Sequence, residues 1–268
     1  MKPHFRVISW LLAVLGLSIT PATALTPTEP DNLGLLVPAY FYPGANDTRW
    51  AALAAAAQQV SVTAILNPAS GPGNNTDSNY EQVIRAVRAA GGRVIGYVHT
   101  QYGKRSLNEV AAEINRYANL YEIDGIFIDE MASDDEAASI LYFESVYQLI
   151  KAVHSNWLVV GNPGVKPARR HLDLPTADTF VQFEQTGAAW RDREVIHWPA
   201  EYGKERFAEL IHSVSERSLV SQIVDQAIRN RIGYVYVTDD LMNNPWDELP
   251  TWWEHLVSLL ANRSASGG

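Results

Sequence analysis

The 268-residue chain contains no cysteine. This absence excludes disulfide bonds, thiolate catalysis and every metal site built on cysteine. A chain without covalent cross-links depends on its hydrophobic core, and apolar residues make up 47% of this one. The length fits one α/β barrel, which typically takes about 250 residues.

Positive charge is also scarce. The 21 Lys and Arg residues are outnumbered by 30 Asp and Glu residues, which gives a formal net charge of −9. No run of Lys and Arg forms a basic patch, so we expect no nucleic acid among the partners. The acidic balance is compatible with a cationic substrate, although it is also typical of an ordinary protein surface.

Several common catalytic motifs are missing. Neither G-x-G-x-x-G nor a P-loop motif follows the first predicted strand, which disfavours the nucleotide-binding sheets. G-x-S-x-G is absent, so a serine hydrolase would lack its nucleophile elbow. Neither H-x-H nor H-E-x-x-H occurs, and we expect neither a metal site nor a cofactor.

The N-terminus has the pattern of a secretion signal. Lys2 and Arg6 precede an apolar run over Val7–Leu17, and Ala22–Ala24 forms a small-residue cleavage pattern. The run is short for a membrane span, although an uncleaved anchor is the alternative. We therefore expect residues 1–24 to be a signal peptide. The mature protein is then secreted, or periplasmic in a Gram-negative host, a monomer, and without stable membrane insertion.

From Asn32 onward, short apolar runs alternate with helical patterns. We predict helices at Asp47–Gln59, Tyr80–Ala90, Glu136–His154, Ser218–Asn230 and Trp252–Leu260, and one opening at the capping box Ser106–Glu109. The predicted strands are Leu33–Tyr42, Ser61–Asn67, Arg93–His99, Gly125–Glu130, Trp157–Gly161, Thr179–Glu184, Phe207–Val214 and Gly233–Thr238.

Eight strands separated mostly by helices predict a single (β/α)8 TIM barrel in the α/β class, with a doubly wound sheet as the alternative. The barrel domain is expected over residues 25–262 and a disordered tail over residues 263–268.

Polar side chains collect at the carboxyl ends of these predicted strands, where a barrel of this kind has its active site. Three of them are carboxylates, namely Asp129, Glu130 and Glu184. The others are candidate substrate-binding residues: Tyr40, Asn67, Tyr97, His99, Asn162, Gln182 and Asp239. His212 is a further hydrogen-bonding candidate. Exposed aromatic rings can stack on sugars, and Tyr42, Trp190, Trp198 and Trp246 join the tyrosines above as candidates.

The acidic residues are the candidate catalytic groups. Asp129 and Glu130 end a run that is otherwise apolar, and a buried charge needs solvent, a partner or a substrate. Alternation sends their side chains to opposite faces, so one can line the cavity while the other supports it. Glu184 lies two strands away, and side chains from the two strands can approach to about 5–9 Å. That range includes both the retaining and the inverting geometries of glycosidases.

Five motifs follow one another along the chain. They are LLVPAYFYP (Leu35–Pro43), ILNPASGPG (Ile65–Gly73), GYVHTQYG (Gly96–Gly103), DGIFIDE (Asp124–Glu130) and GNPG (Gly161–Gly164). Together, in this order, they resemble the spherulin-4 family, which is glycoside hydrolase family 135, related to the endo-α-1,4-polygalactosaminidases of family 114. The resemblance extends over about Leu33 to Asp240.

The resemblance implies a (β/α)8 barrel that cleaves α-1,4-linked N-acetylgalactosamine or galactosamine within exopolysaccharides such as galactosaminogalactan. It implies that Asp129 is the nucleophile, Glu184 the general acid/base, and Glu130 an assisting residue that positions or binds substrate. The alternatives are a non-catalytic polysaccharide-binding surface protein on the same barrel, a glycosidase of another specificity, and a metal-dependent deacetylase.

Overall fold

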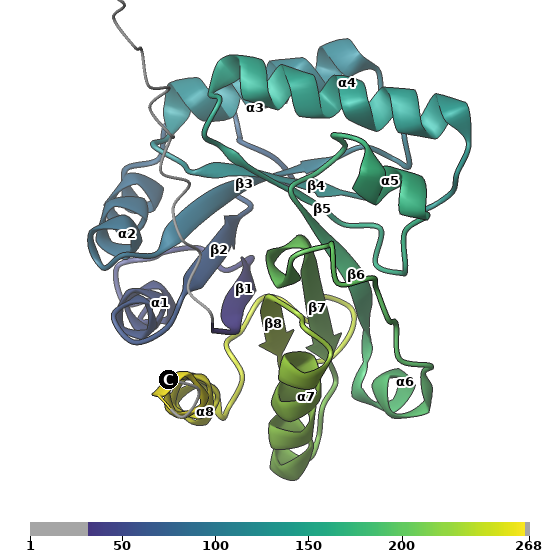
Figure 1. Ribbon diagram of the computed structural model, residues 1–268. Coiled ribbons are helices and arrows are strands. Elements are labelled where there is room, and N and C mark those ends of the chain that lie inside the picture. The colour runs from purple at the N-terminus through teal and green to yellow at the C-terminus, as the bar shows by residue number, and fades with distance from the viewer. Residues whose placement is uncertain (1–31, 266–268) are drawn as a thin grey trace, which may run out of the picture.

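The computed structural model describes residues 32–265. The expected signal peptide, residues 1–24, lies outside the described residues. Within the described range the chain forms one closed barrel in which eight parallel strands follow one another in chain order (Figure 1). The predicted (β/α)8 barrel is therefore confirmed, and the alternative of a doubly wound sheet is excluded.

Each strand pairs with its two sequence neighbours, and β8 closes the barrel against β1. Most strand residues are fully buried because the strands are covered by side chains inside the barrel and by helices outside it. The strands are β1 (Gly34–Ala39), β2 (Val62–Leu66), β3 (Arg93–His99), β4 (Gly125–Asp129), β5 (Leu158–Gly161), β6 (Thr179–Thr186), β7 (Phe207–His212) and β8 (Tyr234–Val237).

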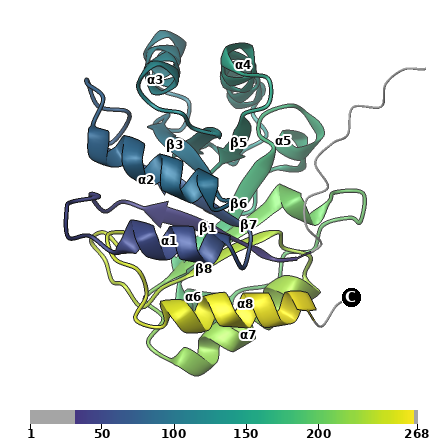
Figure 2. The same cartoon turned by 90° about the vertical axis from the view of Figure 1, so that its left-hand side faces the viewer.

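The helices surround the barrel, and α1 lies beside α8 while α3 lies beside α4 (Figures 1 and 2). Two short helices, α5 and α6, were not predicted, because five and six residues are too few to show helical periodicity. The helices are α1 (Arg49–Ala57), α2 (Ser78–Ala89), α3 (Leu107–Leu120), α4 (Ala137–Val153), α5 (Arg169–Asp173), α6 (Gly187–Asp192), α7 (Arg217–Arg229) and α8 (Trp253–Ala265).

Local sequence signals explain where helices begin and end. The predicted capping box is present at α3: the Ser106 hydroxyl accepts a hydrogen bond from the Glu109 amide, and the Glu109 carboxylate accepts one from the Ser106 amide. The helix α2 ends just before Gly91, whose φ of 92° is a conformation that favours glycine. Helix α3 then packs closely on the barrel, because Gly96 of β3 leaves space for the ring of Tyr117.

Helix α8 corrects part of the expected disordered tail over residues 263–268, because residues 263–265 belong to the helix. The helix continues to Ala265, and residues 266–268 lie outside the described range. Leu256, Val257 and Leu260 anchor the helix in the core, and an ion pair of 2.9 Å between Arg263 and Asp225 of α7 holds its last turns. The predicted boundary at Leu260 was drawn from the apolar pattern alone, which ends there.

Two further features bear on the class of protein. In the described part of the chain, no helix combines the length and the apolar character that a membrane span requires. Over the same residues, His, Asp and Glu side chains do not come together in a group of three or more that would hold a metal ion.

Candidate active site

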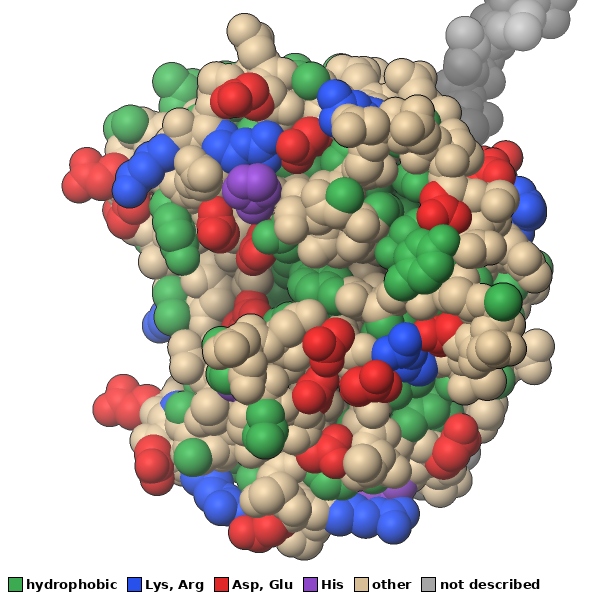
Figure 3. Space-filling model, turned by 180° about the vertical axis from the view of Figure 1, so that it is seen from behind, with side chains coloured by type: hydrophobic (Ala, Val, Ile, Leu, Met, Phe, Trp, Pro, Cys, Tyr) green, Lys and Arg blue, Asp and Glu red, His purple; other side chains and the backbone are tan. Residues whose placement is uncertain are grey.

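A pocket of about 700 Å³ lies at the carboxyl ends of the strands, where the sequence predicted the active site. Its walls come from the ends of β4, β6 and β7 and from the loops that follow β3, β5 and β8. The surface in Figure 3 is hollowed between two lobes, and acidic side chains lie in and around the hollow. The loop segments that contribute most are Asn162–Val165 and Met242–Trp246.

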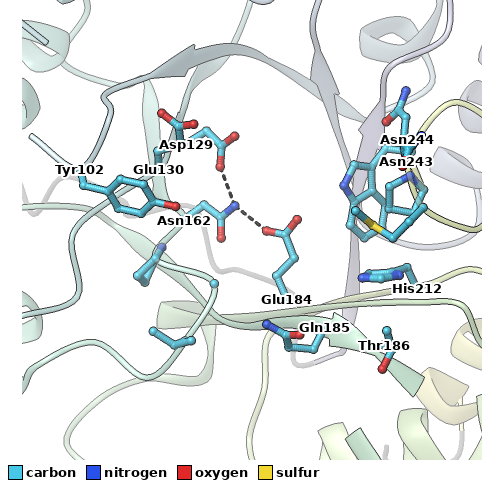
Figure 4. Close-up of a pocket in the computed structure, with 16 residues that line it drawn as sticks. Tyr102, Asp129, Glu130, Asn162, Glu184, Gln185, Thr186, His212, Asn243 and Asn244 are labelled. Carbon is cyan, nitrogen blue, oxygen red and sulfur yellow. Dashed lines mark hydrogen bonds between the residues drawn. The ribbon is translucent and has the colours of Figure 1, made fainter. Parts of the chain in front are cut away.

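Two of the three predicted carboxylates meet across this pocket through one amide group. The side-chain nitrogen of Asn162 donates to Asp129 Oδ1 at 2.8 Å and to Glu184 Oε2 at 2.6 Å (Figure 4). Because both oxygens lie that close to one nitrogen, they are at most about 5.4 Å apart. Asn162 comes directly after β5, between the strands that carry the two acids, so barrel topology explains its bridging position.

Glu184 is held in a buried environment that favours its protonated form. Burial, followed by the nearby negative charge of Asp129, raises the pKa of Glu184 to about 7. Hydrogen bonds from Asn162 and Trp246 act in the opposite direction but do not cancel the shift. A carboxyl group that keeps its proton near neutral pH can act as a general acid.

Asp129 is surrounded by hydrogen-bond donors. Besides Asn162, the Tyr97 hydroxyl donates to Asp129 Oδ2 at 2.7 Å. Burial and the charge of Asp129 raise the pKa of Tyr97 well above its usual value, so this hydroxyl remains a donor. Tyr40 packs edge-on against Tyr97 at 5.7 Å between ring centroids, and its pKa is raised for the same reasons. Tyr97 therefore holds Asp129 directly and Tyr40 packs against Tyr97, and neither tyrosine is part of the pocket lining.

Glu130 lines the pocket, but its carboxylate is engaged by the main chain. Its Oε2 accepts a hydrogen bond of 3.0 Å from the Gln101 amide, and its backbone has a φ of 52°. The left-handed conformation turns its side chain away from Glu184, as Figure 4 shows. Both Asp129 and Glu130 line the pocket, so strand alternation does not separate them as expected: β4 ends at Asp129, and Glu130 follows it with a left-handed backbone.

The wall opposite Asp129 contains two residues that the sequence named as candidates, His212 and Trp246, and two that it did not predict. His212 ends β7 and packs edge-on against Trp246 at 5.7 Å, while its Nδ1 lies 2.9 Å from Ser213 Oγ. Burial lowers the pKa of His212. Trp246 was a candidate for stacking, and it lines the pocket. The neighbouring Asn243 and Asn244 were missed, because a long loop after a strand carries no periodic signal that would place it.

Besides Tyr40 and Tyr97, three further predicted substrate-binding residues lie outside the pocket lining and instead stabilise loops. The Asn67 side-chain oxygen accepts a hydrogen bond from the Gly71 amide at 2.9 Å. The carboxylate of Asp239 accepts hydrogen bonds from the amide and hydroxyl groups of Thr251. His99 lies beside Arg105, which donates to its carbonyl oxygen at 2.7 Å. The three residues are at the predicted end of the barrel, yet the side-chain oxygens of Asn67 and Asp239 and the main-chain carbonyl of His99 accept hydrogen bonds from neighbouring loop residues.

Gln182 is the clearest correction to the predicted site. Its side chain is 1% exposed, donates to Glu209 Oε1 at 3.0 Å and accepts from the Trp198 indole at 2.7 Å. The reason is a β-bulge between Val181 and Phe183, which breaks the alternation of sides along β6. Glu184 therefore faces the pocket, whereas Gln182, two residues earlier, belongs to a buried network away from it.

Comparisons with known proteins agree with this architecture. The crystal structure of Aspergillus clavatus Sph3 in complex with GalNAc is 28% identical, with a TM-score of 0.75 over 86% of this chain and 98% of that one. A family 18 chitinase from Pseudoalteromonas aurantia is 11% identical with a TM-score of 0.51, over 85% of this chain and the whole of that one. At that identity the likeness concerns the fold alone.

The sequence relationships are more specific. Spherulin-4 of Physarum polycephalum is 35% identical over 252 residues, which cover 88% of this chain and 74% of that protein. The family model described as spherulation-specific family 4 matches residues 34–260, which contain the whole barrel from β1 into α8. The chain therefore belongs to the spherulin-4 family.

Proposed function

We propose that this protein is a secreted glycoside hydrolase that cleaves α-1,4-linked N-acetylgalactosamine or galactosamine within a galactosaminogalactan-like exopolysaccharide. The observation that carries the proposal is the pair Asp129 and Glu184, held at most about 5.4 Å apart by Asn162. The pKa of Glu184 is raised to about 7, and Asp129 accepts hydrogen bonds from Tyr97 and Asn162. Two carboxyl groups with such different environments are the machinery of glycoside hydrolysis.

The spacing fits a double-displacement reaction with retention of configuration, for which the carboxyl groups lie about 5–5.5 Å apart. Glu184 donates its proton to the glycosidic oxygen, and the bond from that oxygen to the anomeric carbon breaks as Asp129 attacks the carbon. Ionised Glu184 then takes a proton from water, whose oxygen displaces Asp129 from the anomeric carbon. The second step returns the proton to Glu184 and leaves Asp129 as a carboxylate.

The proposed substrate class rests on two observations. The Sph3 structure, which the chain matches over 86% of its length, is a complex with GalNAc. The pocket is an open cleft of about 700 Å³ with acidic side chains around it, which suits a long polymer that carries amine groups. The open cleft supports the proposal that cleavage takes place within a chain rather than at its end. No cofactor takes part in this proposal.

The proposed location is outside the cell, or in the periplasm of a Gram-negative host. It rests on the signal-peptide pattern over residues 1–24. Expression of the full chain in its host, followed by N-terminal sequencing of the protein in the medium, tests this part. A new N-terminus at Leu25 is the expected result, and retention of Met1 on a cell-bound protein would contradict it.

The activity is tested with two polymers and one matched variant. Purified mature protein and its Glu184→Gln variant are incubated with galactosaminogalactan and with de-N-acetylated polygalactosamine, and released oligosaccharides are measured by mass spectrometry. We expect release by the wild type and a loss of at least about a thousandfold in the variant. Binding of either polymer without release by the wild type would instead identify a non-catalytic polysaccharide-binding protein.

A further inference from the structure

The loop that follows β3 has an unusual backbone next to the site. Gln101, Tyr102 and Gly103 have φ angles of 50°, 55° and 81°, and Glu130 at the end of β4 has a φ of 52°. Such left-handed conformations are rare for residues other than glycine, and they collect at functional sites where surrounding contacts enforce them. Three of these four residues are not glycine, and all four lie beside the catalytic pair, so contacts that enforce this backbone are expected.

The structural cause is Glu130, which holds the loop at three points. Its carboxylate accepts a hydrogen bond from the Gln101 amide at 3.0 Å. Its carbonyl oxygen accepts one from the Tyr102 amide at 2.8 Å and one from the Thr100 hydroxyl at 2.9 Å. We call Glu130 and the segment Thr100–Gly103 the clasp. The clasp fixes the direction in which the Tyr102 side chain leaves the backbone.

The effect of the clasp is to present a large aromatic ring to the pocket. Tyr102 is 58% exposed, although it belongs to the pocket lining. Figure 4 shows its ring on the same side of the pocket as Asp129 and Glu130, with the hydroxyl directed inward. Among the described residues, no hydrogen-bond partner is found for that hydroxyl. The ring therefore contributes little to the core and remains available to a ligand.

We propose that Tyr102 binds a sugar ring of the polysaccharide on the Asp129 side of the cleft, and that Glu130 is a positioning residue that acts through Tyr102. An aromatic ring offers a flat apolar face to the C–H face of a pyranose, and its hydroxyl offers a donor at the rim. One oxygen of the Glu130 carboxylate, Oε2, accepts the main-chain amide of Gln101, and this contact is the basis of its positioning role. This inference rests on the proposed function and assigns a substrate contact within the same site.

The test measures binding in a background that cannot turn over. In the Glu184→Gln protein, affinity for α-1,4-linked N-acetylgalactosamine oligosaccharides and their de-N-acetylated forms is measured by isothermal titration calorimetry. We expect Tyr102→Ala to weaken binding by about tenfold, and Tyr102→Phe by no more than about threefold, because the ring face is kept. Leu141→Ala is the control, since Leu141 on α4 is 65% exposed and lies outside this pocket lining.

Variants of Glu130 distinguish positioning from catalysis. Glu130→Ala removes the carboxylate contact to the Gln101 amide and keeps the two contacts of its main-chain carbonyl, so it should weaken binding by no more than Tyr102→Ala does. The double variant should bind no more weakly than Tyr102→Ala alone, because the Glu130 change acts only through Tyr102. Glu130→Gln keeps an oxygen for the Gln101 amide and should retain binding within about threefold. With Glu184 restored, the same variant should keep kcat within about tenfold of the wild type, whereas a catalytic carboxylate would lose far more.

The measurements distinguish failure of the proposed function from failure of the Tyr102 assignment. If the Glu184→Gln parent binds neither oligosaccharide, both the proposed substrate and the Tyr102 assignment are wrong. If the parent binds and Tyr102→Ala binds equally well, only this inference is wrong. Additive losses in the double variant, or a kcat abolished by Glu130→Gln with unchanged affinity, would also overturn it. Hydrogen exchange over residues 100–103 provides a check without ligand: it should become faster in Glu130→Ala and stay slow in Glu130→Gln.

Discussion

One carboxylate oxygen of Asp129 and one of Glu184 lie at most about 5.4 Å apart, because both accept a hydrogen bond from the same Asn162 nitrogen. At this spacing Asp129 can attack the anomeric carbon directly, because the site leaves no room for a water molecule between the Asp129 carboxylate and that carbon. We therefore expect the first product to have the same anomeric configuration as the substrate. Proton NMR of a reaction in its first minutes measures this before mutarotation, and a product of opposite configuration would contradict the double displacement.

The raised pKa of Glu184 predicts how activity depends on pH. A general acid has to be protonated, and the pKa of Glu184 is raised to about 7, mainly by burial. We therefore expect kcat/KM to be lost as pH rises through about 7, tenfold for each further unit, whereas an ordinary glutamate would lose its proton near 4.5. The measurement is a profile of initial rates from pH 4 to pH 9.

Trp246 offers a control for the assignment of the alkaline limb to Glu184, because the hydrogen bond from Trp246 lowers the pKa of Glu184. Removing the donor with Trp246→Phe should move the alkaline limb of the profile to higher pH. His212→Gln should leave the position of the limb unchanged, since His212 is a separate titrating group in the same pocket. A limb that moves with His212 and not with Trp246 would assign the titration to the histidine.

The raised pKa of Glu184 also affects how the free energy of unfolding depends on pH. Below pH 4.5 Glu184 is protonated in both the folded and the unfolded states, so its ionisation does not change the free energy of unfolding in this pH range. As pH rises from 4.5 to 7, the unfolded chain releases the proton while the folded protein keeps it, and stability falls. Above 7 the loss amounts to about 3 kcal/mol. Glu184→Gln carries no charge and should be more stable than the wild type by about that amount at pH 8.

Urea unfolding of both proteins at pH 4 and pH 8 measures this difference. The two free energies of unfolding should converge at pH 4, where the wild-type carboxyl is also neutral. A constant difference between the proteins at both pH values would mean that the substitution acts through packing and not through the proton.

The sequence could predict the barrel and its two principal acids for a simple physical reason. Parallel strands buried on both faces leave continuous apolar runs, and a charged residue that ends such a run needs a specific partner. Asp129 and Glu184 both follow this pattern, and the β-α-β order places their strands two apart. Asn162 was predicted as a substrate-binding residue, and its position between the two acids also follows from strand order.

What the sequence could not predict depends on loop conformation. Tyr102 lies in a four-residue turn whose left-handed backbone is imposed by Glu130, which is 28 positions later in the chain. Asn67 and Asp239 follow strands as predicted, but their polar atoms are used by nearby main-chain amides. A residue type at a strand end indicates which end of the barrel it occupies. It does not say whether its polar atoms face the cleft or a loop.

Gln182 leads to the last prediction, because the bulge in β6 places it in a structural network rather than at the substrate. In that network Arg193 and Glu209 form an ion pair of 2.8 Å whose side chains are 9% and 2% exposed. Arg193→Ala leaves the Glu209 carboxylate buried without its partner and should lower the free energy of unfolding by about 3–5 kcal/mol. The double variant Arg193→Met with Glu209→Gln removes both charges and should cost less. Gln182→Ala should lower stability and leave oligosaccharide affinity within about twofold of the parent, as calorimetry and urea unfolding would measure. A loss of affinity at unchanged stability would return Gln182 to the binding site.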